Sequence, residues 1–433
     1  MTHTPDAPDS TLPAPPPSVL VGEAELPALR RRVQAVLIAT QILGGLGIAT
    51  GVALAAVLAR DVSGSEAMSG LASTATVAGP ALLAMPLASL MASRGRRAGL
   101  VLAYLIGALG AGVAVLGAVA DSFPLLLLGL VCFGAGSSAN LAARFAAADL
   151  AEPDRRARAI STVVWATTIG AVLGPNIAAP AGRSVSGLGI PATAGPFVWA
   201  AGVFVVAAVV VAVLLRPDPL LTARALADAR TPGEAAEDRS LRAGMRAVRE
   251  SPRARLALVT VAGSHTAMVS IMSMTPVALT HHGADIQLIG LVISGHIAGM
   301  YAFSPLMGWL SDRLGRLSVI GLAVGLIGAA ALIAGTAGPS HGRTALGLFV
   351  LGLGWSAGLV SGSALLTDSV PQASRAAVQG VSDFVMNTAA GVGGLAAGLI
   401  VSKLGYGPLN AIAACLLLPM AVLALRGSLR KAA

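Results

Sequence analysis

Twelve apolar segments, each long enough to form a membrane-spanning helix, constrain the fold of this chain more than any other feature. A helix needs about 20 apolar residues to cross the hydrocarbon core of a bilayer. The expected spans are residues 33–59, 67–92, 98–120, 123–148, 159–181, 196–215, 256–280, 287–310, 318–337, 344–367, 377–400 and 409–426. We therefore expect an all-α membrane protein that contacts the lipid bilayer through twelve transmembrane helices.

Composition agrees with a membrane protein and argues against several other classes. Hydrophobic residues make up 55% of the 433 positions and charged residues only 11%, whereas soluble domains keep about a quarter of their residues charged. Cys132 and Cys415 lie in apolar segments, so we expect neither a disulfide nor a thiolate metal site. The chain lacks a glycine-rich phosphate loop followed by Lys and Ser or Thr. We therefore expect no ATP-driven transport, no enzyme activity and no cofactor.

The positions of the basic residues predict the orientation of the chain. A net charge of +9 is compatible with nucleic-acid binding, but these residues gather at one end of the spans, so we expect no nucleic-acid partner. With a cytoplasmic N-terminus, 24 of the 29 arginines and lysines flank the spans on the inner side. The outer flanks hold Arg60, Arg183, Arg343 and Lys403. We expect a multi-pass protein of the cytoplasmic (plasma) membrane with both termini in the cytoplasm.

Composition and span positions divide the chain into two bundles, a linker and two tails. The expected parts are a disordered cytoplasmic tail (1–32), an N-terminal six-helix bundle (33–215), a cytoplasmic linker (216–254), a C-terminal six-helix bundle (255–426) and a short cytoplasmic tail (427–433). The first tail is rich in proline and acidic residues, which is typical of disorder. The expected role of the linker is to tether the two bundles, with regulation as the alternative.

The second half of the linker has the pattern of an amphipathic helix. From Arg239 to Glu250, apolar residues alternate with arginines at helical spacing. The apolar positions are Leu241, Met245 and Val248, and the basic positions are Arg242, Arg246 and Arg249. Such a helix is expected to lie on the inner membrane surface.

The two halves of the chain match at an offset of about 220 residues. Arg94-Gly95-Arg96 corresponds to Leu314-Gly315-Arg316, Asp149 to Asp368, and Gly170 to Gly391. Six plus six helices with an internal repeat are typical of carriers, in which the substrate binds near mid-membrane between the halves. We therefore expect a carrier, with an ion channel as the rival, and substrate handled between residues 33–215 and 255–426.

The segment from Gly308 to Arg316 matches a known loop motif: G, three residues, D, R, any residue, G, R. Through this motif the chain, over about residues 33–426, resembles the major facilitator superfamily (MFS). The resemblance implies the MFS fold and a secondary transporter, which we expect to be a monomer. In that family the loop latches one state of the transport cycle.

Each motif residue has an expected physical role in this latch. Gly308 and Gly315 permit a tight turn, and Asp312 can accept hydrogen bonds from the N-terminal amides of a neighbouring helix. Arg313 and Arg316 hold the loop to the inner face. The first-half copy departs from the pattern, because Ala88, Ala92 and Ser93 replace the glycine, the aspartate and the first arginine. Its latch is therefore in doubt.

Span five contains a second motif, formed by Gly170, Gly174 and Pro175. Two glycines four residues apart allow a neighbouring helix to approach closely, and proline weakens the helix locally. The segment resembles the signature of drug/proton antiporters. A packing motif without export meaning is at least as well supported.

Soft metal ligands cluster in spans seven and eight. Met268 and Met272 share one helix face, and so do His296 and Met300. An antiparallel hairpin turning near residue 284 places these four residues within a layer of about 6 Å. Thioether and imidazole groups are ligands that Cu(I) prefers. His265, His281 and His282 are possible accessory ligands.

This methionine and histidine spacing resembles the CcoA-type copper importers of the superfamily, in which the two motifs are required for copper uptake. The resemblance implies a Cu(I) substrate site at Met268, Met272, His296 and Met300. The alternatives are a proton-coupled exporter of a drug or an organic metabolite, or methionines that only fill helix interfaces. The expected substrate is thus a small solute or a metal ion.

Two charges lie inside the expected spans. Asp383 in span eleven is a possible coupling acid, because intramembrane acids are functional candidates by default. Pairing with loop arginines is the equally supported alternative. Arg144, near the inner end of span four, is expected to snorkel to the surface or to pair with Asp149.

Overall fold

The computed structural model of the chain describes residues 25–229 and 241–424. Helices make up nearly all of these residues. Twelve segments in the described ranges are long and apolar enough to cross a membrane, and each overlaps one expected span. The prediction of an all-α membrane protein with twelve transmembrane helices is confirmed.

The N-terminal bundle contains the first six spans. Its helices are α1 (Leu26–Ser63), α2 (Glu66–Arg94), α3 (Arg96–Val119), α4 (Phe123–Phe133), α5 (Ala135–Asp149), α6 (Arg156–Ser184) and α7 (Gly195–Leu214). Helices α4 and α5 together form span four, interrupted at Gly134. Helix α1 begins at Leu26, so residues 26–32, which were expected in the disordered tail, are helical. Pro27 fits there because the first turn of a helix tolerates proline.

The linker and the C-terminal bundle follow. The linker contains α8 (Pro219–Asp228) and α9 (Leu241–Glu250), and the bundle contains α10 (Pro252–His281), α11 (Ile286–Tyr301), α12 (Ser304–Leu314), α13 (Arg316–Gly335), α14 (His341–Asp368), α15 (Arg375–Leu404) and α16 (Tyr406–Cys415). Span eight is divided into α11 and α12. Span twelve extends from α16 to Ala424.

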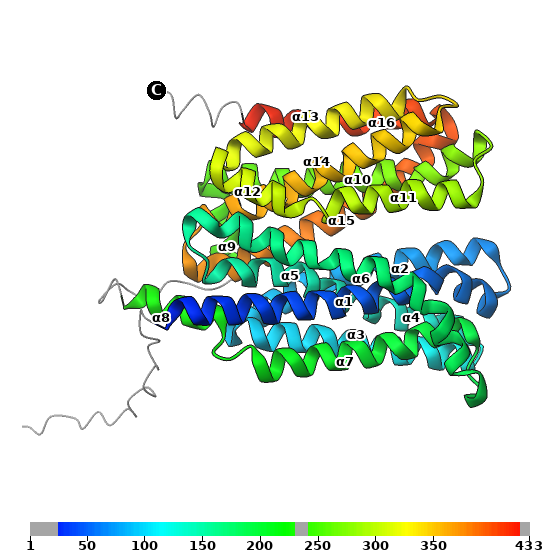
Figure 1. Ribbon diagram of the computed structural model, residues 1–433, viewed down its shortest axis with the longest axis horizontal. Helices are drawn as coiled ribbons and strands as arrows, with labels where there is room; N and C mark the ends of the chain where they lie inside the picture. Colours follow the sequence, from blue (N-terminus) through cyan, green and yellow to red (C-terminus); the bar gives the residue numbers. More distant parts are fainter. Residues whose placement is uncertain (1–24, 230–240, 425–433) are drawn as a thin grey trace, which may run out of the picture.

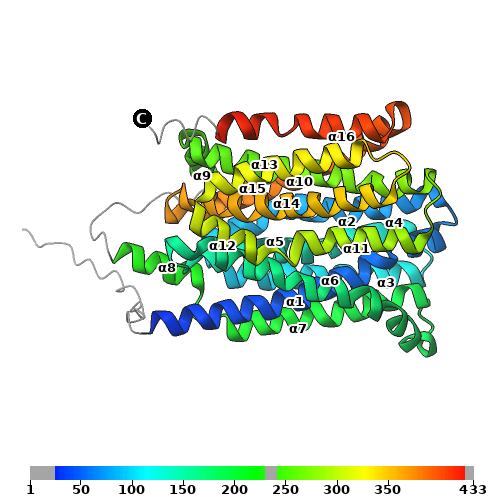
Figure 2. The same ribbon diagram turned by 45° about the horizontal axis from the view of Figure 1, so that its top comes forward.

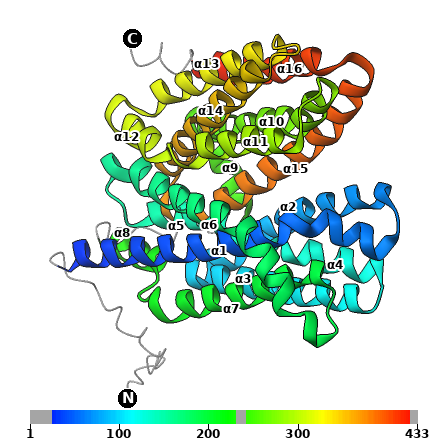
Figure 3. The same cartoon turned by 45° about the vertical axis from the view of Figure 1, so that its right-hand side comes forward.

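The two bundles lie side by side with their long helices running in the same general direction (Figure 1). The start of α1, α8 and α9 gather at one end of the molecule (Figure 2), which we call the inner end. Here α2 of one bundle packs on α15 of the other, and α6 packs on α12. The ribbons of α2 and α15 approach each other near this end and diverge toward the opposite end (Figure 3).

The linker helices pack against the protein. Helix α9 contacts α15, and its Val248 and Ala243 are buried, whereas Met245 is 38% exposed. Part of the apolar face that was expected on the membrane surface therefore covers the C-terminal bundle. Helix α8 was not expected, although Asp218 caps it by accepting hydrogen bonds from the Leu220 and Leu221 amides.

Candidate functional site between the two bundles

Asp312 at the end of α12 connects the C-terminal bundle to the N-terminal bundle. Its two carboxylate oxygens accept hydrogen bonds from the amides of Ala157 (3.1 Å) and Arg158 (2.9 Å) in the first turn of α6. A helix N-terminus favours negative charge, and the Asp312 side chain is only 2% exposed. The structure therefore places this acid on a neighbouring helix N-terminus, as its position in the motif led us to expect.

Arg316 and Asp368 extend this connection. Arg316 lies 2.5 Å from Asp312 and 3.2 Å from Asp368, and it donates to the backbone oxygen of Pro153 (2.8 Å) in the other bundle. Arg156 of α6 also contacts Asp368, at 2.5 Å. Two arginines and two acids thus join the bundles at the inner end.

The two glycines of the motif have different roles. Gly315 has a backbone φ of +88°, in the region that favours glycine, so it permits the turn. Gly308 lies inside α12, and a Cβ there would be 2.0 Å from the Ser161 hydroxyl oxygen of α6. The expected turn role of Gly308 is therefore wrong, because this glycine instead permits the close approach of two helices. Arg313 lies over the Trp309 ring.

The corresponding positions of the first half are arranged differently. Arg96 is buried and pairs with Asp149 at 2.7 Å, and it also donates to the side chain of Gln379 on α15. Arg144 therefore does not pair with Asp149 in this structure. Its partner is Asp383 of α15, at 2.6 Å, and it also donates to the Ser363 hydroxyl at 3.1 Å.

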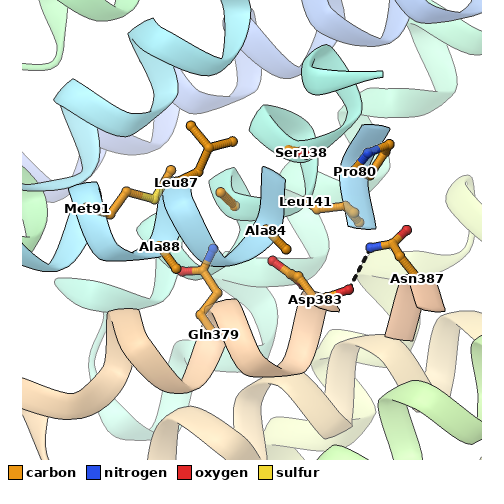
Figure 4. A pocket seen from close by; sticks show the side chains of 11 residues that line it. Pro80, Ala84, Leu87, Ala88, Met91, Ser138, Leu141, Gln379, Asp383 and Asn387 are labelled. Atoms are coloured by element: carbon orange, nitrogen blue, oxygen red, sulfur yellow. Dashed lines mark hydrogen bonds between the residues drawn. The ribbon is translucent and has the colours of Figure 1, made fainter. Parts of the chain in front are cut away.

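A cavity lies beside this pair, between α2 and α5 of one bundle and α15 of the other (Figure 4). Its polar lining residues are Ser138, Gln379, Asp383 and Asn387, and the remainder of its lining is apolar. Asn387 donates to the backbone oxygen of Asp383, which fixes the amide at the cavity wall. Asp383 is the charged member of this lining, and the cavity of about 10 Å³ has room for about one water.

The buried pair of Arg144 and Asp383 spans the two bundles. The two side chains are 1% and 9% exposed. Separating such a pair is costly, because each charge is left without its partner in a poorly solvated place. Asp383 thus has an intramembrane arginine as its partner and is not paired with a loop arginine in this structure.

The methionine and histidine residues of α10 and α11 lie on either side of α14. Both helices pack along α14, and they make few contacts with each other. Met268 and Met300 are buried in one hydrophobic cluster, and Met272 packs against it. His296 is fully buried, and its Nδ1 lies 2.7 Å from the Leu348 backbone oxygen. Its Nε2 has no hydrogen-bond partner among the described residues.

The possible accessory histidines lie in other surroundings. The Nδ1 of His265 accepts a hydrogen bond from the Trp355 indole at 2.9 Å, so this lone pair is occupied. His281 and His282 are exposed at the outer end of α10. The structure thus places His296 beside Leu348 of α14 and gives His265 to Trp355, and the expected direct pairing of α10 with α11 is wrong because α14 packs against both helices.

The glycines of span five pack α6 against α1. A Cβ on Gly170 would lie 2.4 Å from the Leu46 amide nitrogen, and one on Gly174 would lie 2.5 Å from the Ala49 Cβ. Helix α6 continues through Pro175 to Ser184. These contacts account for the two glycines by packing within the N-terminal bundle.

Sequence reasoning missed several residues of this interface, among them Gly380 and Arg224. Gly380 of α15 meets Ala88 of α2, where an added Cβ would lie 2.2 Å from the alanine Cβ. Arg224 of α8 is buried and donates to backbone oxygens of both bundles. The repeat could have indicated Gly380. The offset of about 220 residues relates Ala88 to Gly308 and Gly380 to Ser161, so the contact between Gly308 and Ser161 has its counterpart between Ala88 and Gly380. We find no sequence signal for Arg224.

Comparisons with known proteins agree with this architecture. The family model described as Major Facilitator Superfamily matches residues 36–287 and 256–432. The uncharacterized MFS-type transporter YdeG of Bacillus subtilis is 38% identical over 91% of this chain and 92% of its own. The riboflavin transporter RfnT of Brucella anthropi is 29% identical over 88% of this chain and 92% of its own.

Solved structures share the fold. The proton:xylose symporter XylE superposes with a TM-score of 0.71 at 15% identity, covering 92% of this chain and 95% of that one. The Escherichia coli fucose:proton symporter FucP gives a TM-score of 0.68 at 17% identity, covering 90% and 97%. At these identities the likeness shows the arrangement of helices only.

Proposed function

The chain belongs to the major facilitator superfamily, and we propose that it carries a small organic solute through the cytoplasmic membrane by alternating access. Members of this family are transporters of small solutes and not enzymes. The observation that carries the proposal is the position of the contacts between the bundles. Among the described residues, the hydrogen bonds and ion pairs that join the two bundles lie in the inner half, around Asp312, Arg96 and Arg144.

Alternating access requires these contacts to form and break. When the inner end opens, Asp312 leaves the α6 amides, and Arg156 leaves Asp368. Charge-assisted hydrogen bonds of this kind are stronger than neutral ones, so they hold the closed state until other contacts compensate for them. The motif loop then acts as the latch that its sequence predicts.

Two observations support an organic substrate. The wall between the bundles carries three neutral polar side chains and Asp383 among apolar residues, and these groups can hydrogen-bond a polar organic molecule once the bundles separate. One relative along most of the chain is named as a riboflavin transporter. The name of the uncharacterized relative YdeG gives no substrate.

Counterflow in proteoliposomes tests the organic-substrate proposal without assuming a direction or a coupling ion. Vesicles are loaded with an excess of unlabelled solute, and labelled riboflavin or another organic probe is added outside. We expect transient, saturable accumulation of at least one probe. Unitary currents in planar bilayers would contradict a carrier. Counterflow of Cu(I) without counterflow of any organic probe would exclude the organic substrate.

Asp383 is proposed as the acid that couples transport to protons. It lines the cavity and holds Arg144 of the opposite bundle at 2.6 Å. Protonation would remove its charge and weaken this pair, which favours separation of the bundles. We expect Asp383→Asn to lose accumulation driven by a pH gradient while keeping counterflow. Gradient-driven accumulation at the parent level would rule Asp383 out as the coupling acid.

Cu(I) is the second candidate substrate, and the surroundings of His296 favour it. Its Nδ1 can donate to the Leu348 backbone oxygen, which leaves a lone pair on Nε2. Histidine ligands of metals commonly have this arrangement, with the other ring nitrogen bound to a carbonyl. On the same helix, Met300 follows His296 by one turn and is a potential thioether ligand, whereas Met268 and Met272 belong to α10, which contacts α11 little. The named relatives do not support the copper-importer branch.

Methionine-to-leucine substitution tests the copper site, because it nearly conserves volume while removing the sulfur. A ligand role predicts that Met272→Leu and His296→Ala lose copper uptake and that silver competes. A packing role predicts that Met272→Leu is nearly silent. Copper uptake at the parent level in the double Met268→Leu, Met272→Leu variant would exclude Cu(I) as the substrate of this site.

A further inference from the structure

The inner end of the N-terminal bundle lacks an acid where the C-terminal bundle has Asp312. Ala92 occupies the corresponding position at the end of α2. Beside it lies Arg224 of the linker helix α8, which is 4% exposed. This guanidinium donates to the Ala92 backbone oxygen at 2.7 Å and to the Ala373 backbone oxygen at 3.2 Å. Ala92 lies in the last turn of α2 in one bundle, and Ala373 precedes α15 of the other.

Arg224 reproduces two contacts that Arg316 makes on the other side of the repeat. Arg316 donates to the Ser311 backbone oxygen (2.9 Å) near the end of α12 and to the Pro153 backbone oxygen (2.8 Å) just before α6. Arg316 thus joins the end of α12 to the segment before α6, and Arg224 joins the end of α2 to the segment before α15. In both cases the two joined segments belong to opposite bundles. Arg96, the counterpart of Arg316 by sequence, instead binds Asp149 and Gln379.

Helix α8 is held in place by Asp218. This carboxylate accepts from the Arg97 amide at 2.7 Å, and it also caps α8. A Cβ on Gly95 would lie 2.5 Å from the same carboxylate, so glycine leaves the space in which Asp218 lies. The linker is therefore docked on the turn between α2 and α3, and this docking directs Arg224 to the junction of the bundles.

We propose that α8 is a latch of the inner end, in which Arg224, positioned by Asp218, makes the bridge between the bundles that Arg316 makes on the other side of the repeat. Opening moves Ala92 and Ala373 apart, because they belong to different bundles. Arg224 can then keep only one of these two backbone contacts. Loss of a hydrogen-bond partner by a buried guanidinium raises the free energy of the open state relative to the closed state. Arg224 therefore favours the closed inner end. The proposal rests on alternating access and makes the linker part of the gate.

Distance measurements between spin labels test this latch without any substrate, so the result does not depend on the proposed solute. Cys132 and Cys415 are first replaced by serine, and labels are attached to cysteines at Ala35 of α1 and Ser318 of α13, both exposed on opposite bundles. In the full-length chain in nanodiscs, we expect Arg224→Ala to raise the ratio of inner-open to inner-closed protein about tenfold, or about 1.4 kcal/mol.

Two further variants make the outcome specific. Arg246→Ala removes an exposed arginine from the same linker and should leave the distances unchanged. Arg224→Lys keeps the charge but has a single nitrogen that cannot span two carbonyls in the same way, so it should give an intermediate ratio. Parent-like distances in Arg224→Ala, or an equal rise in Arg246→Ala, would overturn the proposal. If Arg224→Ala does not fold, parent-like distances in Arg224→Lys would overturn it.

Discussion

Small residues decide how closely the bundles approach at both of their main crossings. Where α12 meets α6, Gly308 faces Ser161, and where α2 meets α15, Ala88 faces Gly380. The glycine is thus on the motif helix in one crossing and on the opposite helix in the other. Ala88 departs from the loop motif, but Gly380 supplies the space that the motif glycine otherwise provides.

This crossing predicts the effect of one methyl group at Gly380. We expect Gly380→Ala to hold the inner end open and reduce transport at least tenfold, because its Cβ would lie 2.2 Å from that of Ala88. The matched control is Gly391→Ala in the same helix, where a Cβ meets no atom within 4 Å and transport should persist. Adding Ala88→Gly should rescue Gly380→Ala. Failure of this rescue in a folded double variant would contradict the contact.

Asp312 predicts a second effect at the scale of a single residue. Asp312→Ala leaves the α6 amides and Arg316 without this acid, so we expect transport to fall at least tenfold while the protein still reaches the membrane. Substrate counterflow together with membrane yield measures both. The control is Ser93→Ala in the first-half loop, where the side chain is exposed and the effect should be small. Unchanged counterflow in Asp312→Ala would show that the motif does not act as a latch here.

At the scale of elements, the packing of α6 on α1 bears on the two interpretations of the glycine motif, an antiporter signature and a packing motif. Gly170 and Gly174 bring the α6 backbone against α1 within one bundle. The role of these glycines in packing therefore accounts for the motif without reference to export. Linker helices α8 and α9 likewise act through packing, since both contact the bundles.

The packing role predicts a loss of stability when α6 cannot approach α1. Gly174→Ala adds a Cβ that would lie 2.5 Å from Ala49, and overpacking of this kind costs about 1–3 kcal/mol. We expect a lower thermal midpoint in detergent with an unchanged substrate range. The control is Gly112→Ala in α3, where the added Cβ meets no atom within 4 Å. A changed substrate range at an unchanged midpoint would favour the antiporter interpretation.

At the scale of the whole molecule, the basic residues and the contacts between the bundles gather at the same end. The inner end carries the start of α1, both linker helices and the arginines that join the bundles. The basic residues of the sequence gather on the same side of the spans. Positively charged segments flanking membrane helices tend to remain in the cytoplasm, so we propose that the inner end faces the cytoplasm.

Reporter fusions test this orientation. Fusions near residue 235 and after residue 433, which lie outside the described residues, should report the cytoplasm. Fusions in the 182–195 segment should report the opposite side, because this segment connects the outer ends of α6 and α7. A periplasmic signal at either of the first two positions would contradict the twelve-span orientation.

The sequence by itself determined the number of spans, the two halves and the motif loop. The reason is physical: a bilayer requires a minimum length of apolar helix, and this length is readable in each segment alone. Asp312 was also foreseeable, because its position in the motif places it at a helix end. These features depend on residues that are close together in the chain.

The tertiary structure decided which distant residues meet. Arg144 pairs with Asp383, and Asp149 pairs with Arg96, although the sequence had suggested Asp149 as a partner of Arg144. The tertiary structure also placed α14 between α10 and α11, and brought Arg224 to the end of α2. Such partners follow from how helices far apart in the sequence pack and rotate against one another, and the spacing of residues within a single helix does not specify that packing.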